Sequence, residues 1–276
     1  MGDGDKKPEF VRPLNPKEHG QLIFSGCDTC TLCCDGSTFT CANVLLDEMF
    51  DTAKLFPVVF TKSEERLSLS LLYTLQKGVP CPYLDAETTL CDVYDSVRPR
   101  ACKIFPFNVR EVRAASPEQR SFSVVFDERC PGIRPDEDAP AEKRILGPDG
   151  RLSPEIANGF IGRNMLLRYR ENLRNTQKFL RLVHELELLG EEEVDIGGPP
   201  ATGTFYGQSR PSTIRLWKIG ETRLGELDDE AVMRIHREGY FNAIYTHLNS
   251  LGNLDKLIRM REKFAEKKVD FLSFRV

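Results

Sequence analysis

The spacing of hydrophobic residues predicts short strands and one helix in the first half of the chain. Leucines alternate with serines over residues 67–71, which is a strand-like period, but the longer stretch 63–75 would equally suit a helix. Apolar runs at residues 21–25 and 121–126 predict two further strands. A helix is predicted over residues 47–55, because an aspartate can cap its start and a proline follows its end.

The second half of the chain has the three- and four-residue spacing that is typical of helices. One helix is predicted between residues 153 and 190, with an apolar stripe along one face. Two more helices are predicted over residues 228–251 and 255–268. Residues 191–213 are rich in glutamate, glycine and proline, so we expect a linker or a long loop there.

A basic stripe accompanies the apolar stripe of the helix predicted before residue 190. The simplest interpretation is a helix face exposed to water. The alternatives are binding of an acidic protein partner, a nucleic acid or the phosphate of a cofactor, and the absence of interleaved aromatic residues disfavours nucleic acid. The residues of this stripe are Arg163, Arg170, Arg174, Lys178 and Arg181.

The overall charge limits which partners are expected. The 276 residues include 38 Lys and Arg against 42 Asp and Glu, a net formal charge of −4, and the pI is about 5.7. These values exclude a globally basic nucleic-acid-binding protein. No apolar run approaches the roughly 18 residues that a membrane span needs. The N-terminus has no apolar stretch behind its charges, as a secretory signal would. We therefore expect a cytoplasmic protein that does not enter a membrane.

All nine cysteines lie between residues 27 and 130. An odd number of thiols, no export signal and a chain long enough for its own core argue against a disulfide framework. The CxxCxxCC run over residues 27–34 can place three sulfurs around one centre, which suits a 4Fe-4S cluster whose fourth cysteine is often followed by proline. Structural zinc usually draws on two separate CxxC pairs, and no second pair follows. The pattern favours an iron–sulfur cluster, with zinc as the alternative.

Eight of the cysteines form a candidate metal-ligand set, enough for one or two sites with four ligands each. The ninth, Cys41, is interpreted equally well as a small packed hydrophobic residue. Which thiols would share a site stays open. The eight candidates are Cys27, Cys30, Cys33, Cys34, Cys81, Cys91, Cys102 and Cys130.

These patterns together predict an α+β fold in three parts. Residues 1–20 are a lead-in segment rich in proline and charge. Residues 21–135 are expected to form a small, irregular, cysteine-rich metal-binding domain. Prolines and charges between residues 131 and 150 indicate a domain boundary, and residues 150–276 are expected to form a mainly helical domain.

The cysteine motifs follow one another in a specific order. After CxxCxxCC come CP-x-L at residues 81–84, C-x-x-Y at residues 91–94 and RP-x-x-C-x-x-FP at residues 98–106. This order resembles the CxxCxxCC cysteine-cluster family (YkgJ-like), whose members are described as zinc- or iron-chelating. The resemblance covers about residues 20–135 and implies metal binding by the cysteines of these motifs.

The cysteine pattern and this resemblance together leave three alternative functions open. The first is a binding or electron-transfer protein with one or two iron–sulfur clusters, and the second is a structural module that chelates zinc. The third follows from one branch of the family, the flagellin lysine N-methylases, and is an iron–sulfur and S-adenosylmethionine-dependent protein lysine methyltransferase. The sequence offers no Ser/His/Asp or Cys/His arrangement for catalysis, so catalytic residues and substrate stay open.

Overall fold

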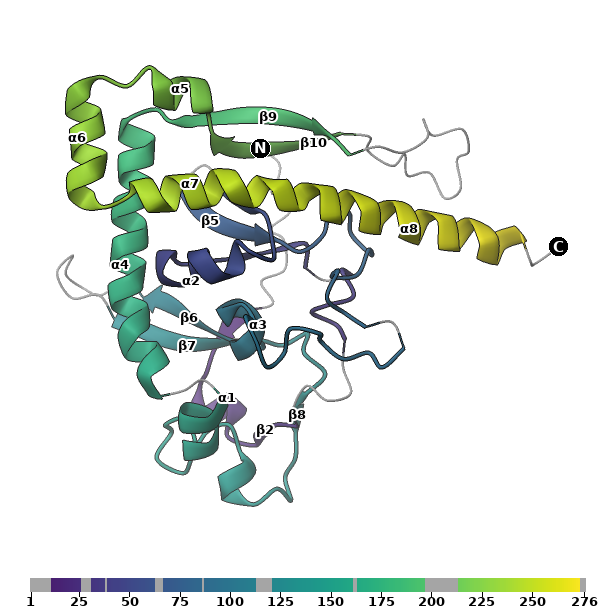
Figure 1. The fold of residues 1–276 in the computed structure, drawn as a ribbon. Coiled ribbons are helices and arrows are strands. Elements are labelled where there is room, and N and C mark those ends of the chain that lie inside the picture. The colour runs from purple at the N-terminus through teal and green to yellow at the C-terminus, as the bar shows by residue number, and fades with distance from the viewer. Residues whose placement is uncertain are drawn as a thin grey trace, which may run out of the picture. The chain divides into compact units, whose positions relative to one another are not determined.

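Figure 1 shows a computed structural model of the chain, in which helices and antiparallel sheets are combined, in agreement with the predicted α+β class. Its contacts divide the chain into two compact units: unit 1 is Met1–Thr31 with Arg100–Arg170, and unit 2 is Leu32–Pro99 with Glu171–Val276. The domain boundaries predicted at residues 20, 135 and 150 are not tested by this division and stay predictions. The residues that the structure describes are 11–25, 31–37, 39–62, 67–85, 87–112, 121–160, 163–196 and 213–273.

Unit 1 contains a three-stranded and a two-stranded antiparallel sheet. In the larger sheet β7 lies between β1 and β6, and in the smaller one β2 pairs with β8. A core of Phe107, Phe126, Ile145 and Ile156 fills this unit. Its elements are β1 (Val11–Pro13), α1 (Pro16–His19), β2 (Leu22–Phe24), α3 (Arg100–Ile104), β6 (Phe107–Val112), β7 (Ser121–Asp127), β8 (Ile133–Pro135), the 3-10 helix η1 (Ala141–Lys143) and the π-helix η2 (Glu155–Phe160).

Unit 2 contains a five-stranded antiparallel sheet in the order β3-β5-β4-β10-β9. Helices α7 and α8 follow one another along nearly the same line, joined by the short helix η3 (Figure 1). Helix α4 (Arg163–Glu185) enters this unit at Glu171. The other elements are β3 (Cys41–Asn43), α2 (Leu46–Thr52), β4 (Val58–Lys62), β5 (Leu67–Leu72), β9 (Leu189–Asp195), β10 (Thr213–Ile219), α5 (Glu221–Gly225), α6 (Asp229–Glu238), α7 (Phe241–Ser250), η3 (Leu251–Asn253) and α8 (Leu254–Ser273).

The apolar core of unit 2 joins its sheet to its last helix. Val59 of β4 and Leu216 of β10 pack with Leu254 and Leu257 of α8 in one buried cluster. Each fully buried side chain of this size stabilises the folded state by roughly 1.5–3 kcal/mol. The sheet and α8 therefore stabilise each other, although their residues are far apart in the sequence.

Most elements predicted from local spacing are confirmed. The strands predicted at residues 21–25 and 121–126 are β2 and β7, and the ambiguous leucine–serine stretch is the strand β5. The helix predicted at residues 47–55 is α2, which ends at Thr52; its N-cap is Leu45 rather than the predicted Asp47, and the Leu45 N–H donates to the Glu48 carboxylate at 3.4 Å. The helices predicted in the last fifty residues correspond to α6, α7 and α8.

The linker predicted at residues 191–213 is wrong at its start, because residues up to Asp195 form β9. Strand β9 pairs along its whole length with β10, from Leu189 opposite Ile219 to Asp195 opposite Thr213. Glutamate is uncommon in strands, so three in a row do not predict one. The long-range pairing with β10 and the burial of β10 residues outweigh this local tendency. Glu192 also forms an ion pair with Lys218 of β10.

His247 of α7 bridges the strands β4 and β10, in which Trp217 lies opposite Phe60. Its Nε2 accepts a hydrogen bond from the Ile219 backbone N–H at 3.1 Å, so Nδ1 carries the proton and donates to the Val58 carbonyl at 2.8 Å. The imidazole is fully buried. Burial lowers the pKa of His247 to about 4, so the ring is neutral at pH 7.

Within the described ranges, none of the helices is both long and apolar enough to cross a membrane.

Candidate ligand-binding pocket

The described cysteines are free thiols that occur in both units. Cys33 and Cys34 are adjacent, with Sγ atoms 3.7 Å apart. In the described part of the chain, no group of three or more His, Cys, Asp or Glu side chains is placed to hold a metal ion. Cys27 and Cys30 lie outside the described residues. The others are Cys41 in β3, Cys81 and Cys91 after β5, Cys102 in α3, and Cys130 before β8.

The surroundings of Cys33 and Cys41 disfavour the thiolate, the ionised form of the cysteine side chain. The hydrogen bond with Cys34, followed by burial, raises the pKa of the Cys33 thiol far above its ordinary range. Burial also raises the pKa of Cys41. Without a bound metal, Cys33 and Cys41 are therefore both protonated, and so less reactive, near neutral pH.

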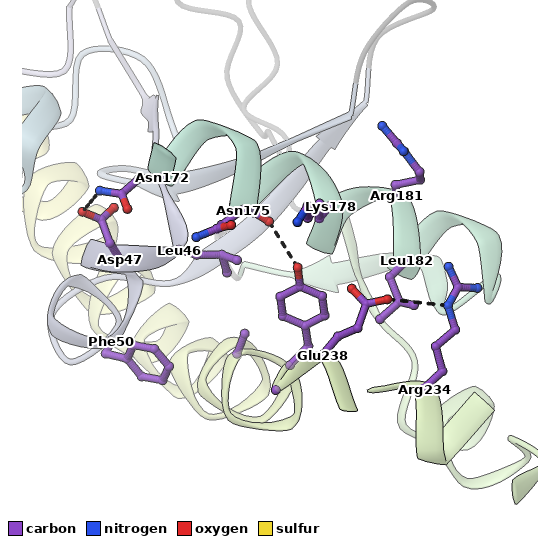
Figure 2. Close-up of a pocket in the computed structure, with 13 residues that line it drawn as sticks. Leu46, Asp47, Phe50, Asn172, Asn175, Lys178, Arg181, Leu182, Arg234 and Glu238 are labelled. Atoms are coloured by element: carbon purple, nitrogen blue, oxygen red, sulfur yellow. Dashed lines mark hydrogen bonds and ion pairs between the residues drawn. The ribbon is translucent and has the colours of Figure 1, made fainter. Parts of the chain in front are cut away.

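A pocket of about 790 Å³ lies in unit 2 and provides a better candidate site. Its wall is built from the second half of α4, the start of α2 and the junction between α6 and α7 (Figure 2). This volume falls within the range of small-molecule sites, which is roughly 300–1,000 Å³.

Helix α4 supplies the polar wall of the pocket. Asn172, Asn175, Lys178 and Arg181 follow one another at three-residue intervals, with Leu182 at the end. Lys178 and Arg181 are exposed, and neither forms an ion pair with another described residue. The helical rise of about 1.5 Å per residue separates Asn172 from Arg181 by about 14 Å along the axis. The pocket is therefore longer than a single anion.

Helix α2 supplies Leu46, Asp47 and Phe50, and α4 holds the start of that helix in place. The buried Thr176 accepts a hydrogen bond from the Leu46 N–H at 3.0 Å through its Oγ1, which also donates to the Asn172 carbonyl at 2.7 Å. Asn172 Nδ2 donates to a carboxylate oxygen of Asp47. Phe50 is 38% exposed, which is unusual for so large an apolar side chain, and its ring is therefore accessible at the pocket.

The junction of α6 and α7 supplies the third wall, including Arg234, Glu238, Tyr240 and Ala243. Gly239 adopts a φ of 74°, a left-handed conformation that ends α6 and turns the chain directly into α7. The Tyr240 hydroxyl donates to the Asn175 carbonyl at 3.5 Å (Figure 2). The ring of Tyr240 also packs edge-on against Phe179, with ring centroids 5.2 Å apart. The hydroxyl and the ring of Tyr240 thus both contact α4.

The charges in the pocket are unevenly balanced along its length. Arg234 donates to Glu185 and lies 3.8 Å from Glu238, so its charge is offset by two carboxylates. Lys178 and Arg181, at the same end, lack such partners among the residues described. Asp47 lies at the opposite end, beside Asn172. One end of the pocket is therefore positive and the other end carries a carboxylate.

A family model named SapC matches residues 14–257, which is most of the chain. The chain belongs to the SapC family. No curated protein and no solved structure matches it.

The SapC match corrects the family and the function inferred from the cysteines. The resemblance to the CxxCxxCC cysteine-cluster family was wrong, because the family model that matches the chain, over residues 14–257, is SapC. The predicted iron–sulfur or zinc function is also wrong: the family is SapC, and the described residues contain no group arranged for a metal. The prediction of S-adenosylmethionine chemistry depended on the same resemblance and loses its support with it.

The sequence revealed only part of the pocket in this SapC chain. The basic stripe contributes Lys178 and Arg181 to the pocket, whereas Arg174 is exposed outside it. The side chains of Arg163 and Arg170 lie outside the described part of the structure. Asn172 is two positions from both Arg170 and Arg174, about 200° around the helix, so the spacing of the stripe does not indicate it. Nothing in the sequence connects these residues with α2 or α6.

Proposed function

We propose that this SapC-family protein binds a small, elongated ligand that carries a carboxylate, phosphate or similar anionic group. The observation that carries this proposal is the pair of exposed cations, Lys178 and Arg181, at one end of a pocket of ligand size. A charged group of the ligand would form charge-assisted hydrogen bonds with both side chains. Apolar contacts with Phe50 and Tyr240 would supply the rest of the binding free energy.

The fixed geometry of the pocket supports this proposal. Thr176 attaches α2 to α4, and Tyr240 attaches the α6–α7 junction to α4, through the hydrogen bonds described above. The walls are therefore positioned before a ligand arrives, and less conformational freedom is lost on binding. Arg234 is held by its two carboxylates and can assist the two free cations without itself collapsing into the pocket.

Phenyl phosphate and 4-phenylbutyrate are suitable probes, because each joins an anionic group to an aromatic ring. Isothermal titration calorimetry of the full chain should show saturable binding of at least one probe with one site per chain. The K178E/R181E double variant should lose this binding by tenfold or more. Arg174→Glu is the matched control, because Arg174 is an exposed cation on the same helix but outside the pocket, and it should bind as the parent does.

Two results would overturn the proposal. One is that neither probe binds the parent chain. The other is that K178E/R181E and R174E weaken binding equally, since this would show a general effect of surface charge rather than a site. Circular dichroism of each variant should match the parent, which ensures that the comparison concerns folded protein.

A further inference from the structure

We propose that Cys33 and Cys34 form a reversible thiol–disulfide site, which exchanges with low-molecular-weight disulfides. Both residues belong to unit 2, but neither lines the pocket, so this proposal is independent of the ligand proposed there. Oxidation would join the two neighbouring sulfurs in one ring and release the small disulfide as two thiols.

The first argument is the short distance between the two sulfurs. Neighbouring side chains of an extended chain point to opposite sides. Residues 32–34 instead form a turn, in which the Sγ atoms of Cys33 and Cys34 lie 3.7 Å apart. A disulfide bond is about 2.05 Å long, so the sulfurs need to approach by less than about 2 Å. Both thiols are free and only half-buried, so a small molecule can reach them.

The second argument is that the turn is held in place by residues 78–81. The Cys34 carbonyl accepts from the Cys81 N–H at 2.7 Å, and the Gly36 carbonyl accepts from the Gly78 N–H at 2.8 Å. Gly36 has a φ of 73°, and a β-carbon there would collide with the Val79 carbonyl oxygen. The backbone therefore keeps the two sulfurs near each other, which favours reaction between them over reaction with a second molecule.

The third argument is a positive charge beside the pair. The hydrogen bond with Cys34 and burial raise the pKa of Cys33, but the charge of Arg98 acts in the opposite direction. The guanidinium carbon of Arg98 lies 4.3 Å from the centre of the Tyr94 ring. Its Nε atom is buried and has no hydrogen-bond partner among the residues described. Arg98 is therefore placed to stabilise a thiolate that forms at Cys33.

The exchange begins at Cys34, because Cys33 retains its proton. The Cys34 thiolate forms a bond to one sulfur of the small disulfide, whose S–S bond breaks and releases the other half as a thiolate. This step produces a mixed disulfide in which the Cys34 sulfur carries no charge. The hydrogen bond to an anionic Cys34 and the repulsion from its charge, which both disfavour ionisation of Cys33, are then lost.

In the second step Cys33 gives its proton to the released thiolate and attacks the Cys34 sulfur. The bond between Cys34 and the small molecule breaks, and its second half leaves as a thiolate that takes up a proton from water. The protein has then lost two electrons and two protons, and the small disulfide has gained them to become two thiols.

Differential alkylation of the full chain tests the proposal. The reduced protein is incubated with glutathione disulfide, its remaining thiols are blocked with N-ethylmaleimide, and the oxidised cysteines are reduced and labelled with iodoacetamide. Tandem mass spectrometry should find the second label on Cys33 and Cys34 together, and dithiothreitol added before blocking should abolish it. The first label on either residue, under conditions that oxidise other cysteines or none, would overturn the proposal.

Single variants test the order of the steps. Cys33→Ser should retain one glutathione on Cys34, because the second sulfur is missing. Cys34→Ser should react at least tenfold more slowly, because Cys33 is protonated. Cys41→Ser, in β3, is the control and should behave as the parent does. The order would be wrong if C34S took up glutathione as fast as C33S did.

Arg98 is tested as a positioning residue through the mixed disulfide. Arg98→Gln should slow ring closure several-fold, so that the glutathione adduct of the parent sequence accumulates, whereas Arg98→Lys keeps the charge and should restore closure. Lys77→Gln, at an exposed position of the loop that holds the turn, is the control for net charge. Equal rates of closure in R98Q and K77Q would overturn the role of Arg98. Circular dichroism of every variant should match that of the parent.

Discussion

His247 Nδ1 lies 2.8 Å from the carbonyl oxygen of Val58, a residue 189 positions earlier in the chain. The same ring accepts from Ile219 of the neighbouring strand, so one side chain of α7 satisfies a backbone group on each of two strands. Buried backbone groups without partners are costly. The imidazole therefore replaces part of the strand pairing that is sparse between β4 and β10.

The stability of the chain should depend on pH through His247. Burial, with a smaller contribution from the charge of Lys218, lowers the pKa of this imidazole from 6.5 to about 4. Below pH 6.5 the unfolded chain takes up a proton here while the folded chain does not, so the free energy of unfolding falls as the pH falls towards 4. The full contribution, present above pH 6.5, is roughly 3 kcal/mol.

Urea unfolding at pH 7.5 and pH 5 measures this effect. The difference in unfolding free energy between the parent and His247→Gln should shrink at the lower pH. His236→Gln, at an exposed position of α6, is the control and should not reproduce that change. A parent–H247Q difference that is equal at both pH values would contradict the assignment of a neutral buried ring.

Replacing Ser250 should destabilise the chain by weakening the contact between α7 and β4. Its Oγ accepts from the Val58 N–H at 2.9 Å and donates to the His247 carbonyl at 2.6 Å, and all three groups are buried. Ser250→Ala leaves the Val58 N–H without this partner, at a cost of about 1–3 kcal/mol. Chemical denaturation gives the value, and Asn249→Ala, at the exposed neighbouring position, should change it by far less.

Replacing Gly239 should destabilise the α6–α7 junction. Its φ of 74° is a left-handed conformation that costs a residue with a β-carbon about 1–2 kcal/mol. Space is not the obstacle, because a β-carbon there would meet no atom within 4 Å. Gly239→Ala should therefore lower the thermal midpoint, and Gly252→Ala, in open space without a positive φ, should not. Equal effects of the two variants would argue against backbone strain as the cause.

Removing the Thr176 hydroxyl should affect stability and binding together. Thr176→Val keeps the shape but leaves the Leu46 N–H without its side-chain acceptor, at a cost of about 1–3 kcal/mol. The start of α2 would be less firmly held against α4, so affinity for phenyl phosphate or 4-phenylbutyrate should fall several-fold. Thr176→Ser restores the hydroxyl and should recover both properties. Weakened stability with unchanged affinity would show that this hydrogen bond does not organise the pocket.

Local pattern predicted several of the elements but not their assembly. The alternation around Leu69 suited a helix as well as the strand that forms there, and the cap of α2 lies at Leu45 rather than at the predicted Asp47. The strand β9 was missed because its glutamates form a strand only when β10 is present to pair with them. The pocket depends on residues between Leu46 and Ala243, whose convergence no short-range period can indicate.

The cysteines show why spacing alone misled the functional prediction. A CxxC spacing permits two sulfurs to reach one metal, but it does not require the rest of a ligand set to converge there. Among the described residues, no group of three or more such side chains is placed to hold one metal ion. The basic stripe was more informative, because Lys178 and Arg181 share one helix and their proximity follows from helical geometry.

The three consecutive glutamates of β9 have a consequence for self-association. Strand β9 is at the margin of the five-stranded sheet, where unpaired backbone groups could template the addition of a strand from another molecule. Two copies that met along this strand would bring Glu191, Glu192 and Glu193 of each together, and the mutual repulsion would oppose amyloid-like growth. The residues that make this segment a poor strand former on its own thus protect the assembled sheet from aggregation.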